Sequence, residues 1–340
     1  MPASSPVAAV VGVGGLVLTG DEAALLRASP PAGAILFGRN VRDPAQLAAL
    51  TAALRAVLPA AAVLLVDQEG GRVARLCPPH WRAHPPAARA GQVFAADAES
   101  GRRLAWLNGA LIGLDCAAMG FDVVCAPVLD LRVAGAHDVI GDRAFAAAPG
   151  PVAELGRAMA EGLLAAGVQP VAKHAPGHGR ARTDSHLGLP VVETAALADD
   201  FAPFARNADL PWMMTSHLLY RAIDPDHPAS QSARVIQGLI RERIGFAGVL
   251  ASDDLAMGAL SGPPEARARA ALAAGCDLAL YCAGDAAGTA AVLRGCPPLS
   301  DAAVARLAAA RNLARDRLLA LDASALDAER SGLMAQWGAR

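Results

Sequence analysis

Eight short apolar runs, spaced along most of the chain and partly β-branched, constrain its fold more than any other feature. They are residues 7–18, 33–37, 61–66, 121–131, 168–172, 212–216, 248–252 and 276–281. Short apolar runs bounded by turn residues are typical of buried strands. Most of the intervals between them hold amphipathic segments with helical spacing. The sequence therefore predicts strands that alternate with helices.

Two of these intervals carry clear helix signals. Asp43 and Pro44 are typical of an N-cap and a first helical residue, and Pro59 ends a stripe formed by Leu47, Leu50, Leu54 and Leu58. A second helix is expected to begin near residues 149–151 and to end at Gly167, with a stripe of Val152, Leu155, Met159 and Leu163.

Eight alternating strands and helices in 340 residues favour a single (β/α)8 TIM-type barrel over a doubly wound sheet. The glycines of residues 12–15 match a dinucleotide-binding turn too weakly to change this interpretation. We assign residues 1–300 to a catalytic barrel and residues 301–340 to a C-terminal helix and a polar tail packed on it. The apolar residues expected on that helix are Val304, Leu307, Leu313 and Leu318.

Composition excludes several classes of partner. A hydrophobic content of 54% with 18% charged residues indicates a globular protein with a large core. A net charge of −2 without basic runs argues against nucleic acid and anionic membranes. No apolar run is long enough to span a membrane, and the first basic residue, Arg27, comes too late for a secretory signal. The six cysteines form no Cys-x-x-Cys pair. We expect a cytoplasmic monomer or weak oligomer that acts on a small molecule without a cofactor.

Polar residues follow five of the predicted strands at their C-terminal ends. The third is followed by Asp67 and Glu69, the fourth by Asp130, the fifth by Lys173 and His174, the sixth by His217 and the seventh by Asp253 and Asp254. In a barrel of parallel strands these ends form one mouth, where active sites lie. A capping carboxylate or a buried structural histidine explains any one of them. Five in the same topological position predict an active site.

The densest part of this pattern is the stretch of residues 173–186, which holds three histidines, a lysine and an aspartate. It starts at the predicted end of the fifth strand and continues through a Gly- and Pro-rich loop that cannot form a helix. We expect residues 177–188 to be a mobile loop. His178 and His217 are expected to line the pocket.

Several motifs together resemble family 3 glycoside hydrolases, specifically the bacterial β-N-acetylglucosaminidases of peptidoglycan recycling. They are residues 35–40 (ILFGRN), 66–73 (VDQEGGRV), 126–130 (APVLD), 140–143 (IGDR), 173–179 (KHAPGHG), 184–186 (DSH) and 252–257 (SDDLAM). Ala175 departs from the family pattern, which has a bulky aromatic residue there. We expect looser packing at this position.

The resemblance implies removal of terminal β-linked N-acetylglucosamine from cell-wall muropeptides, namely N-acetylglucosaminyl-1,6-anhydromuramoyl peptides, by double displacement. Asp253 is the implied nucleophile, which forms a covalent glycosyl intermediate. His186, oriented by Asp184, is the implied acid and base in place of a second carboxylate such as Glu69. The implied substrate-binding residues are Asp67, Arg143, Lys173 and His174, and more weakly Arg75. We expect Asp254 to be structural, as a cap of the next helix.

A metal-dependent hydrolase with the same barrel is the main alternative. The residues His174, His178, Asp184, His186, His217 and Asp253 are all of types that ligate zinc. The resemblance favours a site without metal. A sugar-binding protein that has lost its chemistry is a weaker alternative, because Asp253, Asp184 and His186 are all retained.

Overall fold

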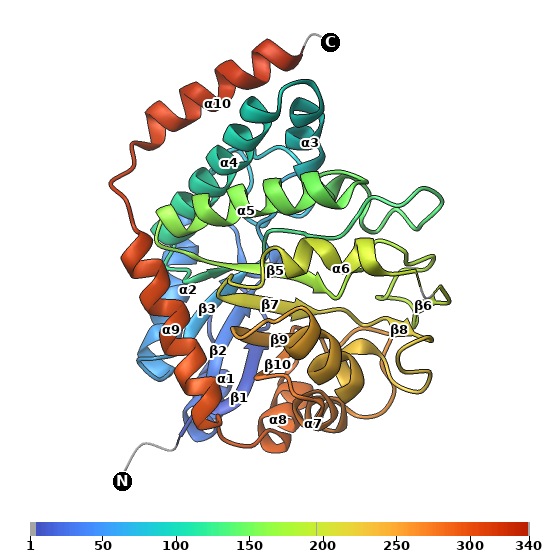
Figure 1. Cartoon of the computed structure of the whole chain (residues 1–340). Helices are drawn as coiled ribbons and strands as arrows, with labels where there is room; N and C mark the ends of the chain where they lie inside the picture. Colours follow the sequence, from blue (N-terminus) through green and yellow to red (C-terminus); the bar gives the residue numbers. More distant parts are fainter. Residues whose placement is uncertain (1–4, 195, 339–340) are drawn as a thin grey trace.

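A closed barrel of eight strands forms the centre of the computed structural model, which describes residues 5–194 and 196–338 (Figure 1). In chain order the strands are β1 (Val7–Gly12), β2 (Pro31–Leu36), β3 (Val63–Val66), β4 (Val123–Val124), β5 (Gln169–Ala175), β7 (Trp212–Thr215), β9 (Val249–Asp254) and β10 (Leu278–Tyr281). Every neighbouring pair is parallel. The predicted (β/α)8 barrel is confirmed.

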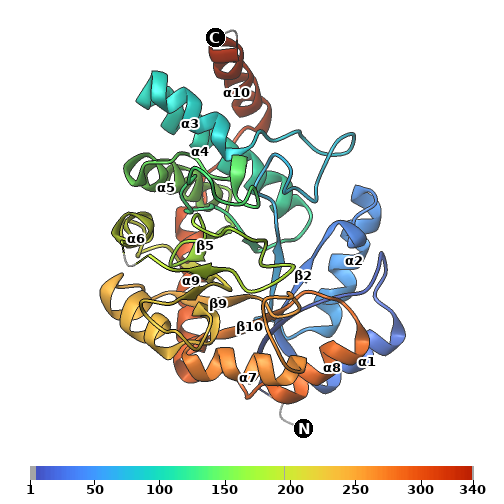
Figure 2. The same ribbon diagram turned by 90° about the vertical axis from the view of Figure 1, so that its right-hand side faces the viewer.

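Helices surround this barrel, as Figure 2 shows from a second direction. They are α1 (Gly20–Ala28), α2 (Pro44–Val57), α3 (Ala87–Ala96), α4 (Ala98–Ala118), α5 (Pro149–Ala165), α6 (Ala198–Ala205), a π-helical segment (Arg234–Arg243), α7 (Pro264–Ala274), α8 (Ala286–Gly295), α9 (Asp301–Arg317) and α10 (Ala323–Gly338). A short parallel pair, β6 (Val191–Val192) and β8 (Leu219–Tyr220), joins two loops outside the barrel. Among the described residues, no helix is both long and apolar enough to cross a membrane.

The two helices with clear sequence signals form as predicted. The carboxylate of Asp43 accepts the amide proton of Gln46 and caps α2, with Pro44 as the first helical residue. Helix α5 begins at Pro149 and ends before Gly167, whose φ of +79° lies in the region that glycine tolerates. Both helices bury their predicted apolar stripes.

Side chains fill the barrel interior, so the barrel is a packed core rather than a channel. The interior cluster contains β-branched and aromatic residues from alternate positions of the strands, among them Val10, Ile35, Val63, Val171, Trp212 and Val249. The indole of Trp212 donates to the side chain of Gln169 at 2.8 Å, so its polar group is satisfied inside this core.

Helix α9 closes the barrel at the end where the strands begin (Figure 1). Leu307 and Ala310 belong to the interior cluster, and Arg306 pairs with Asp277 just before β10 at 2.6 Å. The predicted stripe was wrong at Val304 and Leu318, whose side chains are exposed. The buried face is built from Ala303, Leu307, Ala310 and Ala314, because small residues let the helix approach the barrel end closely.

The predicted polar tail is instead a second helix, α10, which lies beside α4 (Figures 1 and 2). Arg103 of α4 forms a two-pronged ion pair with Glu329, with both N–O distances at 2.7 Å. The buried Arg330 donates to His84 at 2.9 Å. Such contacts offset the low hydrophobicity that made this segment resemble a tail. The domain boundary at residue 300 stays a prediction.

Candidate active site

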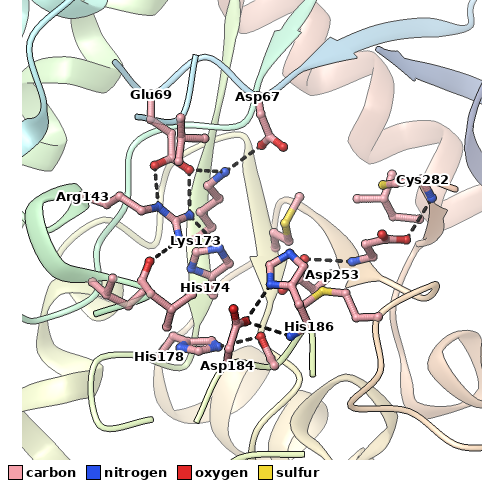
Figure 3. Close-up of a pocket in the computed structure, with 18 of the residues that line it drawn as sticks. Asp67, Glu69, Arg143, Lys173, His174, His178, Asp184, His186, Asp253 and Cys282 are labelled. Carbon is pink, nitrogen blue, oxygen red and sulfur yellow. Dashed lines mark hydrogen bonds and ion pairs between the residues drawn. The ribbon is translucent and has the colours of Figure 1, made fainter. Parts of the chain in front are cut away.

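A cavity of about 300 Å³ lies at the mouth of the barrel, where the strands end (Figure 3). Its wall includes all eight residues predicted for the site, namely Asp67, Arg75, Arg143, Lys173, His174, Asp184, His186 and Asp253. They come from strand ends and loops that are far apart in the sequence. The structure therefore brings the predicted residues together, while their individual roles stay predictions.

Four charged residues on one side of the cavity form a group that we call the ion cluster: Asp67, Glu69, Arg143 and Lys173. The ammonium of Lys173 lies 2.8 Å from Asp67 Oδ1 and 2.7 Å from Glu69 Oε1. The guanidinium group of Arg143 donates two parallel hydrogen bonds to the carboxylate of Glu69, with N–O distances of 2.8 Å each. The side chains of Lys173 and Glu69 are only 3% and 5% exposed. Arg75 extends the cluster through Asp67 Oδ2 at 3.2 Å.

Mutual attraction keeps the ion cluster charged despite its burial. Burial alone would raise the pKa of Asp67, but Lys173 and Arg75 outweigh it and hold that pKa well below its usual range. Burial would lower the pKa of Lys173, but the carboxylates of Asp67 and Glu69 raise it instead. At neutral pH all of these groups therefore carry their charges.

Glu69 is poorly suited to donate a proton in this setting. Burial favours its neutral form, yet the charges of Lys173 and Arg143 lower its pKa overall. Both carboxylate oxygens already accept charge-assisted hydrogen bonds from Arg143, and Oε1 also forms an ion pair with Lys173. Glu69 is thus a structural partner of two cations rather than a candidate acid.

The buried carboxylate of Asp130 fixes the loop that follows β5. Its Oδ2 lies 2.7 Å from His174 Nδ1, and its Oδ1 accepts the amide protons of His174 at 3.2 Å and His178 at 2.6 Å. Burial opposes ionisation, but these partners lower the pKa of Asp130 overall. The imidazole of His174 therefore directs its other nitrogen, Nε2, toward Arg143 at 3.4 Å.

Two adjacent carboxyl groups stand at the end of β9, and their environments differ. Asp253 accepts the amide proton of Asp254 at 2.8 Å, and although burial opposes ionisation, His174 and His217 lower its pKa overall. Asp254 accepts from the amides of Ala256 and Cys282 at 2.9 Å each, while burial raises its pKa. Asp253 is therefore the group that is ready to act as a carboxylate.

Asp254 does not cap the next helix, so that expectation was wrong. Helix α7 begins ten residues further on, at Pro264. Asp254 instead joins the turn after β9 to the end of β10 through its two amide contacts. This bridge holds the backbone that carries Asp253.

Asp184 and His186 face the cavity from the loop opposite the ion cluster (Figure 3). Oδ1 of Asp184 lies 2.8 Å from His186 Nδ1 and also accepts the His186 amide proton at 2.9 Å. Nδ1–H is thereby directed to the carboxylate, which leaves Nε2 without a partner among the described residues. The side chain of His186 is 65% exposed and that of Asp184 is 25% exposed.

Backbone contacts connect this loop to the segment after β9. The carbonyl of Ser185 accepts from the amide of Ala259 at 3.1 Å, and that of His186 accepts from Gly258 at 3.2 Å. A side chain on Gly258 would place its Cβ 2.7 Å from the His186 carbonyl oxygen, so only glycine permits this approach. The predicted mobility of residues 177–188 stays a prediction.

His217 lies outside the cavity wall, so its expected position in the pocket was wrong. The ring is fully buried, with Nδ1 2.7 Å from Ser230 Oγ and Nε2 2.9 Å from the Asp254 carbonyl oxygen. His178 does line the cavity, as expected. In the described part of the chain, no group of three or more His, Cys, Asp or Glu side chains is arranged to hold a metal ion.

Sequence reasoning missed several residues of this site. Phe37 lines the cavity beneath the guanidinium groups of Arg39 and Arg75, which lie 5.0 and 5.4 Å from its ring centroid. Phe37 belongs to one of the recognised motifs, which was the available signal. Met257, which also lines the cavity, had the same signal because it ends the motif 252–257, whereas Cys282 lies in no recognised motif.

The sequence matches the family model described as the glycosyl hydrolase family 3 N-terminal domain over residues 13–307. A β-hexosaminidase from Alkalilimnicola ehrlichii is 42% identical over 308 residues, which cover 88% of this chain and 87% of the relative. A second β-hexosaminidase, from Bordetella parapertussis, is 41% identical over 288 residues, which cover 83% and 81% of the two chains.

Solved structures share the whole fold. NagZ from Neisseria gonorrhoeae, solved in complex with N-trifluoroacetyl-D-glucosamine, superposes with a TM-score of 0.86 at 30% identity and covers 98% of this chain and 99% of its own. A family 3 β-N-acetylglucosaminidase from Paenibacillus gives a TM-score of 0.83 at 30% identity, covering 97% of this chain and 66% of its own.

The barrel and its charged mouth are those of a glycoside hydrolase, and the chain belongs to glycosyl hydrolase family 3. Within that family it groups with the members named β-hexosaminidase.

Proposed function

We propose that this enzyme is a retaining β-N-acetylglucosaminidase that removes terminal β-linked N-acetylglucosamine from cell-wall muropeptides in the cytoplasm. The observation that carries the proposal is that the carboxylates around one cavity have different partners. Asp253 and the Asp184–His186 pair line it, whereas Glu69 is committed to Arg143 and Lys173. The sugar analogue named with the Neisseria NagZ structure supports the choice of N-acetylglucosamine.

In the first step, one oxygen of Asp253 attacks the anomeric carbon while the bond from that carbon to the leaving oxygen breaks. His186 donates its Nε2 proton to this oxygen, and Asp184 stabilises the imidazolium before the transfer. In the second step, His186 removes a proton from water, whose oxygen displaces Asp253 from the anomeric carbon. The lowered pKa of Asp253 supports the role of nucleophile, because the attacking group must be ionised.

The ion cluster suits recognition of sugar hydroxyl groups. The Lys173 ammonium has three protons. It donates to Asp67 and forms an ion pair with Glu69, which leaves donor capacity for a substrate oxygen. Asp67 keeps free lone pairs beside the contacts from Lys173 and Arg75. Charge-assisted hydrogen bonds of this kind strengthen as charge develops on the distorted sugar. Arg143, Arg75 and His174 complete the proposed substrate-binding set.

Covalent labelling tests the proposed nucleophile. A 5-fluoro derivative of N-acetylglucosaminyl fluoride should add the mass of one sugar to the intact protein, and the labelled peptide should contain Asp253. Label on Glu69 would transfer the role to that residue. Inhibition without any label would instead favour participation by the acetamido group of the substrate, which forms no enzyme adduct.

Product analysis tests the proposed substrate. Incubation with N-acetylglucosaminyl-1,6-anhydromuramoyl peptide should release free N-acetylglucosamine and the intact anhydromuramoyl peptide. A parallel reaction with phosphate shows whether phosphate replaces water as acceptor. Equal catalytic efficiency on β-glucosides would contradict the assignment to N-acetylglucosamine.

A further inference from the structure

Ser185 lies between Asp184 and His186, the pair that we call the dyad. It has the only buried side chain in the segment 183–187. Its exposed fraction is 2%, although Asp184 and His186 on either side face the cavity or solvent. Its hydroxyl lies 3.2 Å from Nε2 of His178. An exposed loop is thus fixed at its centre by one side chain that points inward.

The other end of this contact is anchored to the barrel. The amide of His178 donates to Asp130 at 2.6 Å, and its ring packs edge-to-face on His174 with ring centroids 5.5 Å apart. Burial and the neighbouring His174 lower the pKa of His178 to about 4, so the ring is neutral at neutral pH. Its Nδ1 has no partner among the described residues, which leaves Ser185 as its only side-chain hydrogen bond.

We propose that the His178–Ser185 hydrogen bond is a tether that sets the position of the Asp184–His186 dyad over the cavity. Ser185 and His178 are then positioning residues for proton transfer. This inference rests on the proposed function, in which His186 is the acid and base.

The tether can control His186 because residues 184–186 are bound to one another. Asp184 Oδ1 contacts both the amide and the ring of His186, so a shift of Ser185 displaces the imidazole with the backbone. A general acid must lie within hydrogen-bond distance of the leaving oxygen, and a displacement of about 1 Å is enough to weaken it. The backbone contacts to Gly258 and Ala259 do not use the Ser185 side chain, so Ser185→Ala removes the tether alone.

The test compares two substrates of different leaving-group quality. Ser185→Ala should lower kcat/KM for a β-1,4-linked N-acetylglucosamine disaccharide by roughly tenfold, the effect of about one hydrogen bond. The 4-nitrophenyl glycoside should change by less than about twofold, because its leaving group departs with little protonation. Ser185→Thr, which keeps the hydroxyl, should restore most of the loss.

Two further variants separate positioning from folding. Thr183→Ala removes a hydroxyl group from an exposed residue of the same loop. This hydroxyl has no hydrogen-bond partner in the described structure, so the substitution should leave both substrates unaffected. His178→Leu breaks the tether from the barrel side and should reproduce the selective loss. It serves as the test if Ser185→Ala unfolds in a thermal melt.

A double-mutant cycle gives the deciding result. In a His186→Ala background, Ser185→Ala should have no further effect, since the group that it positions is gone. Equal losses on both substrates, or additive losses in the double variant, would overturn the tether. A His186→Ala variant that slows both substrates equally would instead overturn the proposed acid and base role, and the tether with it.

Discussion

The ion cluster and the loop that carries Asp184 and His186 face each other across one cavity (Figure 3). The two differ in how deeply their side chains are buried and in how many partners fix them. Lys173 is nearly inaccessible and pairs with two carboxylates. His186 is 65% exposed, and its side chain bonds to a single residue, Asp184. One side is anchored at the ends of barrel strands, and the other is attached to a surface loop.

This difference separates two requirements of catalysis. Groups that bind a sugar work best when they are fixed before it arrives, because little free energy is then lost in ordering them. A proton donor must reach the leaving group and still let two sugars enter and leave. The comparison predicts that substitutions in the barrel affect every substrate, or stability, while substitutions in the loop affect selected substrates and leave stability unchanged.

The largest effect is expected at Asp253, which belongs to the barrel side of this comparison. Asp253→Ala should lower kcat on both the aryl glycoside and the disaccharide by at least about 10⁴-fold, because it removes the nucleophile. Steady-state kinetics with both substrates measures this. Preserved turnover of either one would remove Asp253 from the proposed mechanism.

The next effect is expected at His186 on the loop. His186→Ala should slow cleavage of the disaccharide by about 10²–10⁴-fold, the usual contribution of general acid–base catalysis, and should slow the first step on the aryl glycoside far less. The unfolding free energy should change by less than about 0.5 kcal/mol, since the side chain is exposed. Glu69→Gln showing the leaving-group pattern instead would shift the proton donor to Glu69.

A smaller effect, on stability, is expected when the ion cluster is broken. Glu69→Gln removes the charge that Arg143 and Lys173 share, and loss of one partner from a buried ion pair costs about 3–5 kcal/mol. Urea denaturation at neutral pH measures this loss. Asp142→Asn, which breaks the exposed pair with Arg72, is a matched control that should cost at most about 1 kcal/mol. Similar losses for the two variants would contradict the distinction between the cluster and the surface.

The smallest effect concerns pH. Because the folded pKa of Asp67 lies below its usual value of 3.8, its ionised form stabilises the fold above that pH, and this contribution disappears as pH falls through the folded pKa. The difference in unfolding free energy between the wild type and Asp67→Asn should therefore be constant from about pH 5 to 8 and shrink below about pH 4. A difference that grows on acidification would contradict the assignment of charges in the cluster.

Much of this architecture could be predicted from local patterns. The eight strands were recognisable because barrel strands are buried on both faces and read as continuous apolar runs. Helix α2 was equally clear, because Asp43 and Pro44 mark its start. Helix α10 was missed because its apolar face is sparse, with only Met334 and Trp337 of its described residues packed against the core, and because the buried contact of Arg330 with His84 gives no apolar signal.

The site was predictable as a set of residues but not as a network. The position of each residue at a strand end was enough to expect that the set converges. The pairing of carboxylates with cations depends on side-chain directions across the barrel mouth. The ion pair between Glu69 and Arg143 therefore left no signal in the sequence. The inward side chain of Ser185 was hidden for the same reason. The cis peptide between Lys173 and His174 also gave no signal, because residue 174 is not proline.

The internal pairing of the ion cluster also bears on the ionic strength at which the enzyme works. At the cavity, the carboxylates of Asp67 and Glu69 are paired directly with the positive charges of Arg75, Arg143 and Lys173. An uncharged sugar therefore enters without displacing counter-ions from solution, and contacts as buried as these are screened little by added salt. The KM for an uncharged substrate should accordingly stay nearly constant as sodium chloride is raised from dilute buffer to well above physiological concentrations.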